Sequence, residues 1–412
     1  MEKLNPIVLS IPIFFLLIGI ELVVERLSHR KLYRLPDAIA NMSCGITSQL
    51  SGLFMRILGV GVYTILFNNF QLLIVKQLLP TWAYWLTLYL LVDLAYYWAH
   101  RMSHEINLFW GGHVVHHQSE DYNLSVALRQ SSFQVVWTFA FSLPIAVIGY
   151  KPEDFVYVSA LNTLYQFWIH TETINKLGWF EYIFNTPSHH RVHHGRDPKY
   201  IDKNHAGSLI IWDKMFGTFQ AEEEHPTYGI TRPINSWNAV WANFSHYAVM
   251  ADEIRQIPKW SDKVKYLFKK PGWLPKEMGG YRPAPAVDKN AYRKYDTPAP
   301  VLMNYYVLAQ YIVCLAATSL LLFNEKTLTD TQKEIGALLI SWWVVNCGVL
   351  FEQKNWIRAA EFARIILFSA GLSAAVLFYS LPATLHVVSV VYALGSVAWL
   401  SKLTQYEAKL AA

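Results

Sequence analysis

The sequence has few charged residues for its length. Asp, Glu, Lys and Arg together account for 16% of its 412 residues, whereas hydrophobic residues account for 53% and aromatic residues for 15%. Soluble globular domains carry about 25% charged residues. The shortage of charge therefore argues against an ordinary soluble domain of this length and indicates a membrane protein.

Cysteine is also scarce, and no long run of basic residues occurs. The three cysteines, Cys44, Cys314 and Cys347, stand singly inside apolar segments, without the CxxC spacing of thiolate metal sites. This pattern argues against structural disulfides and against thiolate ligands. The formal net charge is only +5, and no Lys/Arg run would follow a nucleic acid backbone. Nucleic acid is therefore not an expected partner.

What the sequence does contain is a series of long apolar runs. A helix needs about 20 predominantly apolar residues to cross a bilayer. Three such runs come early in the chain and four come late, near residues 7–25, 42–67, 82–99, 302–323, 335–351, 361–380 and 383–400. The chain is therefore expected to cross the membrane several times.

Two shorter apolar arms, 133–148 and 155–169, are joined by Gly-Tyr-Lys-Pro-Glu-Asp and predict a hairpin that enters the membrane without having to cross it. The stretch from 171 to 300 is polar, and its end is rich in proline. We expect an all-α, polytopic membrane protein with a cytosolic, histidine-rich helical core. Its expected parts are a catalytic region at 1–280 with the histidine core at 93–220, a linker at 281–300 and a four-helix transmembrane region at 301–412.

The distribution of basic residues predicts the orientation in the membrane. Glu25-Arg26 follows the first apolar run where a signal peptide would have a small-residue cleavage site, which predicts a retained anchor. The loop after this run carries four basic residues, whereas the next loop carries only Lys76. By the positive-inside rule the N-terminus lies outside, and 100–132 and 171–300 are cytosolic. We expect the endoplasmic reticulum of a eukaryote or the inner membrane of a bacterium.

Histidine is concentrated in one region. Ten of the fifteen histidines lie between His100 and His194, and most of them form HxxxH at 100–104, HxxHH at 113–117 and a second HxxHH at 190–194. Positions i, i+3 and i+4 of a helix face the same way. Each HxxHH is therefore expected to direct three imidazoles to one point, and HxxxH two.

So many imidazoles predict two metal ions. A structural zinc takes four ligands, so eight histidines exceed the needs of one metal. Imidazole suits iron, zinc, copper and nickel alike. Oxidation of an unactivated C–H bond needs a redox metal and O2, which favours iron. We expect His170, which ends the second hairpin arm, to join the site, and His189 to point away from it. The predicted metal ligands are His100, His104, His113, His116, His117, His170, His190, His193 and His194.

Two acidic residues are candidates for supporting or catalytic roles. Metal-bound imidazoles usually donate their second N–H to a carboxylate or a carbonyl. Asp93 precedes His100 by seven residues on the same helical face, and Glu105 directly follows His104. The alternatives are that Asp93 is a buried polar group satisfied by Tyr96 or Tyr97, and that Glu105 is an ordinary charge at a helix end.

The order and spacing of the three histidine motifs resemble the membrane fatty acid hydroxylase and sterol desaturase superfamily. The likeness runs from about residue 10 to 250, and the segments 100–107, 119–130, 167–172 and 185–195 look closest to the branch of the superfamily that acts on alkylglycerols. The late group of four apolar runs also fits the extended C-terminus of that branch.

The resemblance implies a di-iron monooxygenase of a membrane lipid. It would use O2 and tetrahydrobiopterin to hydroxylate the ether-linked carbon of an alkylglycerol, and the product would break down to an aldehyde and a glycerol derivative. The eight tandem histidines would be iron ligands, and Glu105 would be an important acidic residue. One departure is His205, which stands where relatives generally carry an aromatic residue. It would either touch the metal site or replace a tyrosine hydrogen bond.

Other functions fit parts of this pattern. A sterol or fatty acid hydroxylase or desaturase would take its electrons from a separate electron-donor protein, and no pterin-binding motif is readable. A zinc-dependent intramembrane hydrolase is disfavoured because His104-Glu105 lacks the second histidine of HExxH. A non-enzymatic metal carrier would need ligands strung along a path through the membrane. The role of the late spans, the oligomeric state and the exact lipid stay open.

Overall fold

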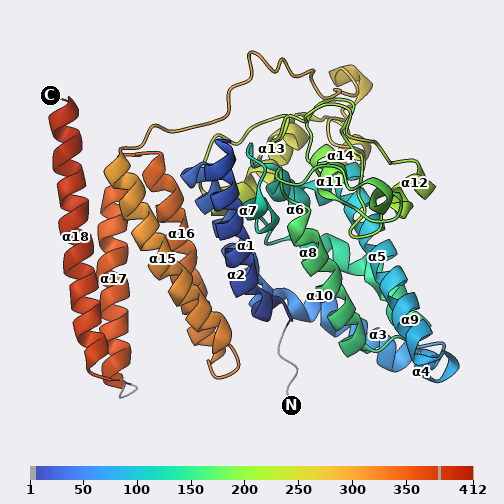
Figure 1. Cartoon of the computed structure of the whole chain (residues 1–412), viewed down its shortest axis with the longest axis horizontal. Coiled ribbons are helices and arrows are strands. Elements are labelled where there is room, and N and C mark those ends of the chain that lie inside the picture. The colour runs from blue at the N-terminus through green and yellow to red at the C-terminus, as the bar shows by residue number, and fades with distance from the viewer. Residues whose placement is uncertain (1–5, 379–381, 412) are drawn as a thin grey trace. The chain divides into compact units, whose positions relative to one another are not determined.

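A computed structural model describes residues 6–378 and 382–411 of the chain (Figure 1). The regular secondary structure of these residues is helical. The single β-bridge among them joins Phe184 and Leu209. The prediction of an all-α protein is confirmed.

The chain divides into two compact units. The first unit comprises residues 1–234 and 242–295, and the second comprises 235–241 and 296–412. The main division falls inside the stretch expected as a linker. The contribution of 235–241 to the second unit was not expected from the sequence, because nothing in its composition separates it from its neighbours.

The first unit begins with five helices, the last of which carries His100 and His104. The chain forms α1 (Pro6–Ser28), α2 (Leu35–Arg56), a π-helical turn (Ile57–Gly61), α3 (Val62–Phe70), α4 (Val75–Leu78) and α5 (Thr81–Glu105). The remaining elements are mostly shorter. They are α6 (Asn107–His117), α7 (Leu124–Ala127), α8 (Gln134–Thr138), a 3-10 turn (Phe139–Ser142), α9 (Leu143–Ile148), α10 (Pro152–Trp168), a 3-10 turn (Gly178–Tyr182), α11 (Pro187–His193), α12 (Ile211–Phe216), α13 (Ala239–Gln256), α14 (Trp260–Phe268) and a 3-10 turn (Lys276–Met278).

The expected hairpin is present, with α8 and α9 as its first arm and α10 as its second. Gly149 ends α9 at φ +115°, where a Cβ atom would lie 1.9 Å from the Leu73 carbonyl oxygen, so only glycine fits. Pro152 then starts α10, with Glu153 and Asp154 in its first turn, where they face the positive end of the helix dipole. Asp154 also accepts a hydrogen bond of 2.9 Å from the Tyr84 hydroxyl on α5. These local signals explain why the arms form where the sequence places them.

Among the described residues, four helices are long and apolar enough to cross a membrane. They are Val301–Phe323, Asp330–Phe351, Ile357–Leu377 and Thr384–Leu403, and a fifth crossing results if the pair Leu35–Met55 and Leu58–Phe70, bent by 42°, forms one span. The protein is therefore an integral membrane protein. The runs expected to cross at 7–25 and 82–99 are helical but are not among these candidates, and crossings there stay predictions. Glu21, Glu25 and Arg26 charge the end of α1, and α5 buries Asp93 and two histidines.

The second unit contains the four late helices α15 (Val301–Phe323), α16 (Asp330–Phe351), α17 (Ile357–Phe378) and α18 (Thr384–Ala411). Its interior holds an ion pair, because the Arg364 guanidinium lies 2.6 Å from the Glu361 carboxylate and both side chains are buried. Every helix of the unit contributes a side chain to this pair. The partners are Tyr306 and Gln310 of α15, Asn346 and Trp343 of α16, and Tyr392 of α18.

Candidate metal centre

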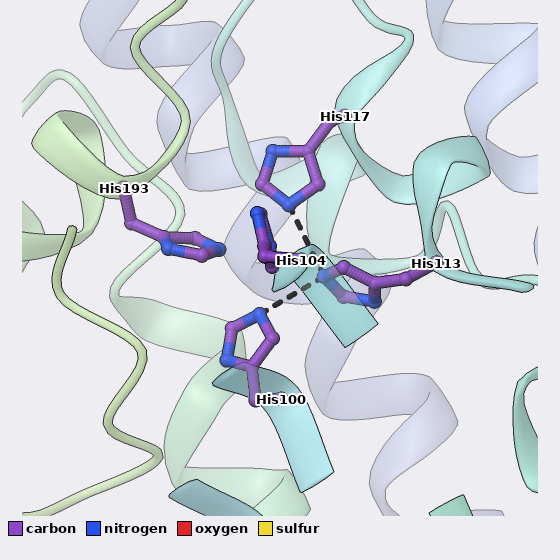
Figure 2. A group of neighbouring side chains, drawn as sticks. All are labelled: His100, His104, His113, His117 and His193. Atoms are coloured by element: carbon purple, nitrogen blue, oxygen red, sulfur yellow. Dashed lines mark hydrogen bonds between the residues drawn. The ribbon is translucent and has the colours of Figure 1, made fainter. Parts of the chain in front are cut away.

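The nine predicted metal ligands come together in the first unit as two groups. The five-histidine group contains His100, His104, His113, His117 and His193, and the four-histidine group contains His116, His170, His190 and His194. All nine side chains are buried, and Figure 2 shows the rings of the five-histidine group directed toward one another. Within each group every ring offers one nitrogen atom, and these nitrogen atoms all lie within 4.8 Å of one another. That these residues bind metal stays a prediction.

The expectation that each HxxHH motif serves one point was wrong. On α6, His113 and His117 join the five-histidine group, whereas His116 joins the other. On α11 and its first following residue, His190 and His194 belong to the four-histidine group and His193 to the five-histidine group. With 3.6 residues per turn, adjacent residues diverge by about 100° whereas i and i+4 differ by only about 40°. The histidines at i and i+4 therefore face the same group, and the histidine at i+3 faces the other group.

Two arginines fix the short helices that carry these motifs. The Arg129 guanidinium donates to the Val115 carbonyl (2.7 Å) and to the Gln118 side chain (2.9 Å) at the end of α6. Arg191 on α11 makes two parallel hydrogen bonds, of 2.8 and 2.7 Å, to Glu222. The same arginine donates to the Thr171 and Ile174 carbonyls just after His170. Because a bidentate pair restrains orientation as well as distance, these contacts fix the helices that carry the histidines of both groups.

Backbone carbonyls orient four of the histidines. The Nδ1 atoms of these rings lie within hydrogen-bond distance of carbonyl oxygens: His100 with His205 (2.8 Å), His116 with Arg129 (3.0 Å), His170 with Gln166 (2.7 Å) and His193 with Lys203 (2.9 Å). A carbonyl only accepts, so each Nδ1 carries the proton and donates it, and each Nε2 presents a lone pair. This tautomer is the one in which metal-binding imidazoles are usually held.

The free nitrogens are spaced as ligands of a shared ion would be. The Nε2 atom of His113 lies 2.9 Å from that of His100 and 3.1 Å from that of His117. In the four-histidine group, the Nε2 atom of His170 lies 3.1 Å from that of His116 and 3.0 Å from that of His190. Ligands about 2.1 Å from one ion and at right angles to each other would be about 3.0 Å apart. The Nε2 atoms of His104, His193 and His194 have no hydrogen-bond partner among the described residues. Both groups therefore fit a metal ion.

Burial also keeps these imidazoles in the form that binds metal. Removal from water lowers the pKa of all nine rings, and for most of them neighbouring imidazoles lower it further. The pKa of His116 falls to about 4 and that of His193 to about 3. At neutral pH the rings are uncharged, and their lone pairs are available without loss of a proton.

Asp93 supports the site through a loop and does not bond to a histidine in the described structure. Its fully buried carboxylate accepts hydrogen bonds from the backbone N–H groups of Ser208 (2.8 Å) and Leu209 (3.1 Å), and from the Trp212 indole (2.9 Å). The Ser208 hydroxyl and the Asn162 amide donate to it as well. Neither Tyr96 nor Tyr97, the partners considered from the sequence, is among these donors. The loop that Asp93 holds also presents the His205 carbonyl to His100.

Replacement of Asp93 by asparagine should therefore loosen this loop. The NH2 group of the asparagine would oppose N–H donors that the carboxylate now accepts from. We therefore expect a loss of about 3 kcal/mol in the free energy of unfolding. Denaturant titration in detergent measures this loss, and metal analysis should show lower metal content. Tyr96→Phe is the control and should change neither. Unchanged stability in Asp93→Asn would contradict the supporting role.

Glu105, the other predicted acidic residue, contacts cations and, among the described residues, bonds to no histidine. Its carboxylate lies 3.2 Å from the Arg101 guanidinium and 3.6 Å from the Lys270 ammonium. The acidic residue nearest to the five-histidine group is Asp202, which was not singled out from the sequence. Its carboxylate lies 3.9 Å from Nδ1 of His104 and 3.3 Å from Lys270. Only its place in the fold brings it there, because almost one hundred residues separate it from His104.

His189 and His205 lie outside both groups. The Nε2 atom of His189 is 4.0 Å from the Glu181 carboxylate, and its ring packs on Phe219. His205 is fully buried, and its ring centroid lies 5.0 Å from that of His104 and 5.6 Å from that of His193. Asp213 accepts from the backbone N–H of His205 at 2.8 Å, and burial raises the pKa of this carboxyl to about 6. His205 is therefore a neighbour of the five-histidine group.

A polar pocket of about 360 Å³ adjoins the four-histidine group on one side. Tyr122 separates the two, because its ring lines the pocket and its centroid lies 5.2 Å from that of His194. Tyr122 stacks on Tyr228 with their centroids 4.7 Å apart. We call this cavity the Tyr122 pocket, and its lining also includes Lys31, Glu120, Glu172, His225, Lys289, Tyr292 and Lys294.

Comparison with known proteins gives consistent matches over most of the chain. The sequence profile of the family described as "Fatty acid hydroxylase" matches residues 85–218. Alkylglycerol monooxygenase of Homo sapiens is 39% identical over 366 residues, which cover 87% of this chain and 80% of the relative. The proteins of the same name from Xenopus tropicalis and Danio rerio are each 37% identical, over 86% of this chain and 79% and 80% of their own lengths. No solved structure matches the chain significantly.

Proposed function

The chain belongs to the alkylglycerol monooxygenase family, and on this premise we propose that it uses two iron ions and O2 to hydroxylate the ether-linked carbon of an alkylglycerol. The hydroxylated product is a hemiacetal, which breaks down to a fatty aldehyde and a glycerol derivative. Hydroxylation places one oxygen atom of O2 in the lipid and reduces the other to water, so two electrons and two protons are also consumed.

The observation that carries this proposal is the contact between the two histidine groups. The rings of His117 and His194, one from each group, stack with centroids 4.4 Å apart, and those of His190 and His193, again one from each group, are 5.1 Å apart. Two irons bound there would activate O2 for insertion into a C–H bond. The protein contributes neutral, pre-oriented imidazoles and a buried site that excludes bulk water. We place this site on the cytosolic side, in keeping with the basic loop that follows α1.

We assign the two electrons to a tetrahydropterin bound in the Tyr122 pocket. A tetrahydropterin loses two electrons and two protons when it becomes a dihydropterin, which balances the reaction. The Tyr122 and Tyr228 rings suit a planar heterocycle, and the carboxylates of Glu120 and Glu172 can accept hydrogen bonds from its N–H groups. Tyr122 would bring the bound reductant close to the four-histidine group.

Replacement of Glu172 by glutamine tests this assignment. The amide loses a charged acceptor, so we expect the KM for tetrahydrobiopterin to rise about tenfold, equivalent to about 1.4 kcal/mol. A single turnover after chemical reduction of the irons should be unaffected. Glu223→Gln, in an exposed loop, is the control. An unchanged KM would remove the pocket as the reductant site and leave the oxygenase proposal standing.

The function itself is tested with the purified protein in detergent. Metal analysis should find about two irons per chain, as the two histidine groups require. After anaerobic reduction, addition of O2 with an alkylglycerol should give fatty aldehyde only when tetrahydrobiopterin is present. Iron without aldehyde would direct the search to sterols and fatty acids with a protein electron donor. Stoichiometric zinc without O2 uptake would refute an oxygenase.

A further inference from the structure

Helix α14 directs large apolar side chains outward from the first unit. Trp260, Val264 and Phe268 are 79%, 50% and 55% exposed. They stand at positions i, i+4 and i+8, so they form one stripe along the helix. The opposite side of α14 packs on the first unit, because Tyr266 is buried there in a cluster with Met250, Ile257 and Leu274. The outer stripe therefore leaves half or more of each of its side chains exposed.

Lysine surrounds this apolar stripe. Residues 259–276 contain six lysines and one acidic residue, Asp262. Some of the lysines have acidic partners, such as Lys265 with Asp262 at 2.9 Å and Lys259 with Glu277 at 3.0 Å. The Lys263 ammonium instead lies 5.4 Å from the centroid of the Trp260 ring. A positive excess thus borders an exposed aromatic stripe, which is the pattern of helices that lie in a lipid–water interface.

We propose that α14 lies in the surface of the membrane that holds this chain. Trp260, Val264 and Phe268 enter the boundary between head groups and acyl chains, and the neighbouring lysines bind anionic head groups. The lipid surface is the partner that matches both features at once, because it is apolar just below a layer of negative charge. A second copy of this chain would have to supply both an apolar groove and an acidic rim.

The contacts of α14 connect this surface to the five-histidine group. The backbone N–H of Asn107, the first residue of α6, donates to the Lys269 carbonyl (2.9 Å), and its side chain donates to the Tyr266 carbonyl (3.2 Å). Just beyond the helix, Lys270 pairs with Asp202, which is the nearest carboxylate to His104. The lipid-facing helix is therefore anchored on the helix that carries three histidines.

Cysteine labelling tests the proposal without any measurement of activity. The three natural cysteines are 0%, 0% and 1% exposed, so a cysteine introduced at the surface can be labelled selectively. Val264→Cys carries an environment-sensitive fluorophore, and Glu223→Cys is the control because the Glu223 side chain is 61% exposed in an acidic loop. Each labelled protein is placed, one chain per disc, in lipid nanodiscs of phosphatidylcholine and phosphatidylglycerol. Some discs contain lipid with a quenching nitroxide near the head group.

We expect the label at 264 to emit at shorter wavelength and to be quenched several-fold more strongly than the label at 223. Equal quenching at the two positions would overturn the proposal, and one chain per disc excludes shielding by a second copy. Lys263→Glu with Lys269→Glu, added to Val264→Cys, should weaken the quenching in discs with phosphatidylglycerol. If the extent of quenching changes neither with phosphatidylglycerol nor with the charge reversal, the assignment of the lysines to anionic head groups is overturned.

Discussion

Replacement of His194 by alanine should reduce the iron content to about one ion per chain and lower aldehyde formation at least 100-fold, because only three histidines remain in its group. Replacement of the adjacent His193 leaves four histidines in the other group. We expect this variant to keep more of its iron but to lose activity to a similar extent, since one coordination position changes. Metal analysis and aldehyde assays on the same preparations measure both effects.

His189→Ala is the matched control for this pair. It changes the same residue type on α11, which carries His193 and ends just before His194, and His189 is buried but lies outside both groups. Its iron content should stay at the wild-type level. If all three variants lost iron equally, the effect would reflect damage to α11, and the division into two groups would not describe the metal sites.

Replacement of Arg364 by leucine should destabilise the protein by about 3–5 kcal/mol, because it leaves the Glu361 carboxylate buried without its counter-ion. The same change removes hydrogen bonds to Gln310 and Tyr392, and the stacking of the guanidinium 4.1 Å from the Trp343 ring centroid. Thermal unfolding in detergent, followed at several protein concentrations, measures the loss.

A double variant separates the cost of an unpaired charge from the value of the pair. Glu361→Leu combined with Arg364→Leu removes both charges, and buried pairs replaced by apolar side chains often cost little. We therefore expect the double variant to be more stable than either single variant. Additive losses would mean that the interaction energy between the two side chains is zero, which would contradict an unpaired charge as the cause of each single loss.

The sequence predicted the architecture where local signals dominate. The late apolar runs, the hairpin arms and the turn at Gly149 depend on composition and on residues close together in the chain. The crossing expected at 82–99 stays a prediction, because this apolar run also contains the buried carboxylate of Asp93. Its carboxylate is acceptable in α5 only because Ser208, Leu209 and Trp212 reach it from more than one hundred residues away.

The sequence also predicts which histidines come together, but one common point for each HxxHH motif differs from the two groups of the structure. The angular difference of about 100° between adjacent helical residues separates the i+3 histidine of each HxxHH motif from the i+4 histidine. The carbonyl acceptors of His100, His116 and His193 had no sequence signal at all. Any residue can supply a carbonyl, so only the folded path of the loops at 129 and 203–205 identifies them.

The position of Glu361 and Arg364 on one helix bears on how the chain is inserted during synthesis. A single arginine at the centre of a spanning helix costs about 2.5–3.5 kcal/mol on insertion. Glu361 lies one turn before Arg364, so α17 brings its own counter-ion and can leave the translocon as an internally neutralised segment. The polar residues of α15, α16 and α18 are needed only later, when the helices associate. We therefore expect α17 to enter the bilayer without the other three helices of its unit.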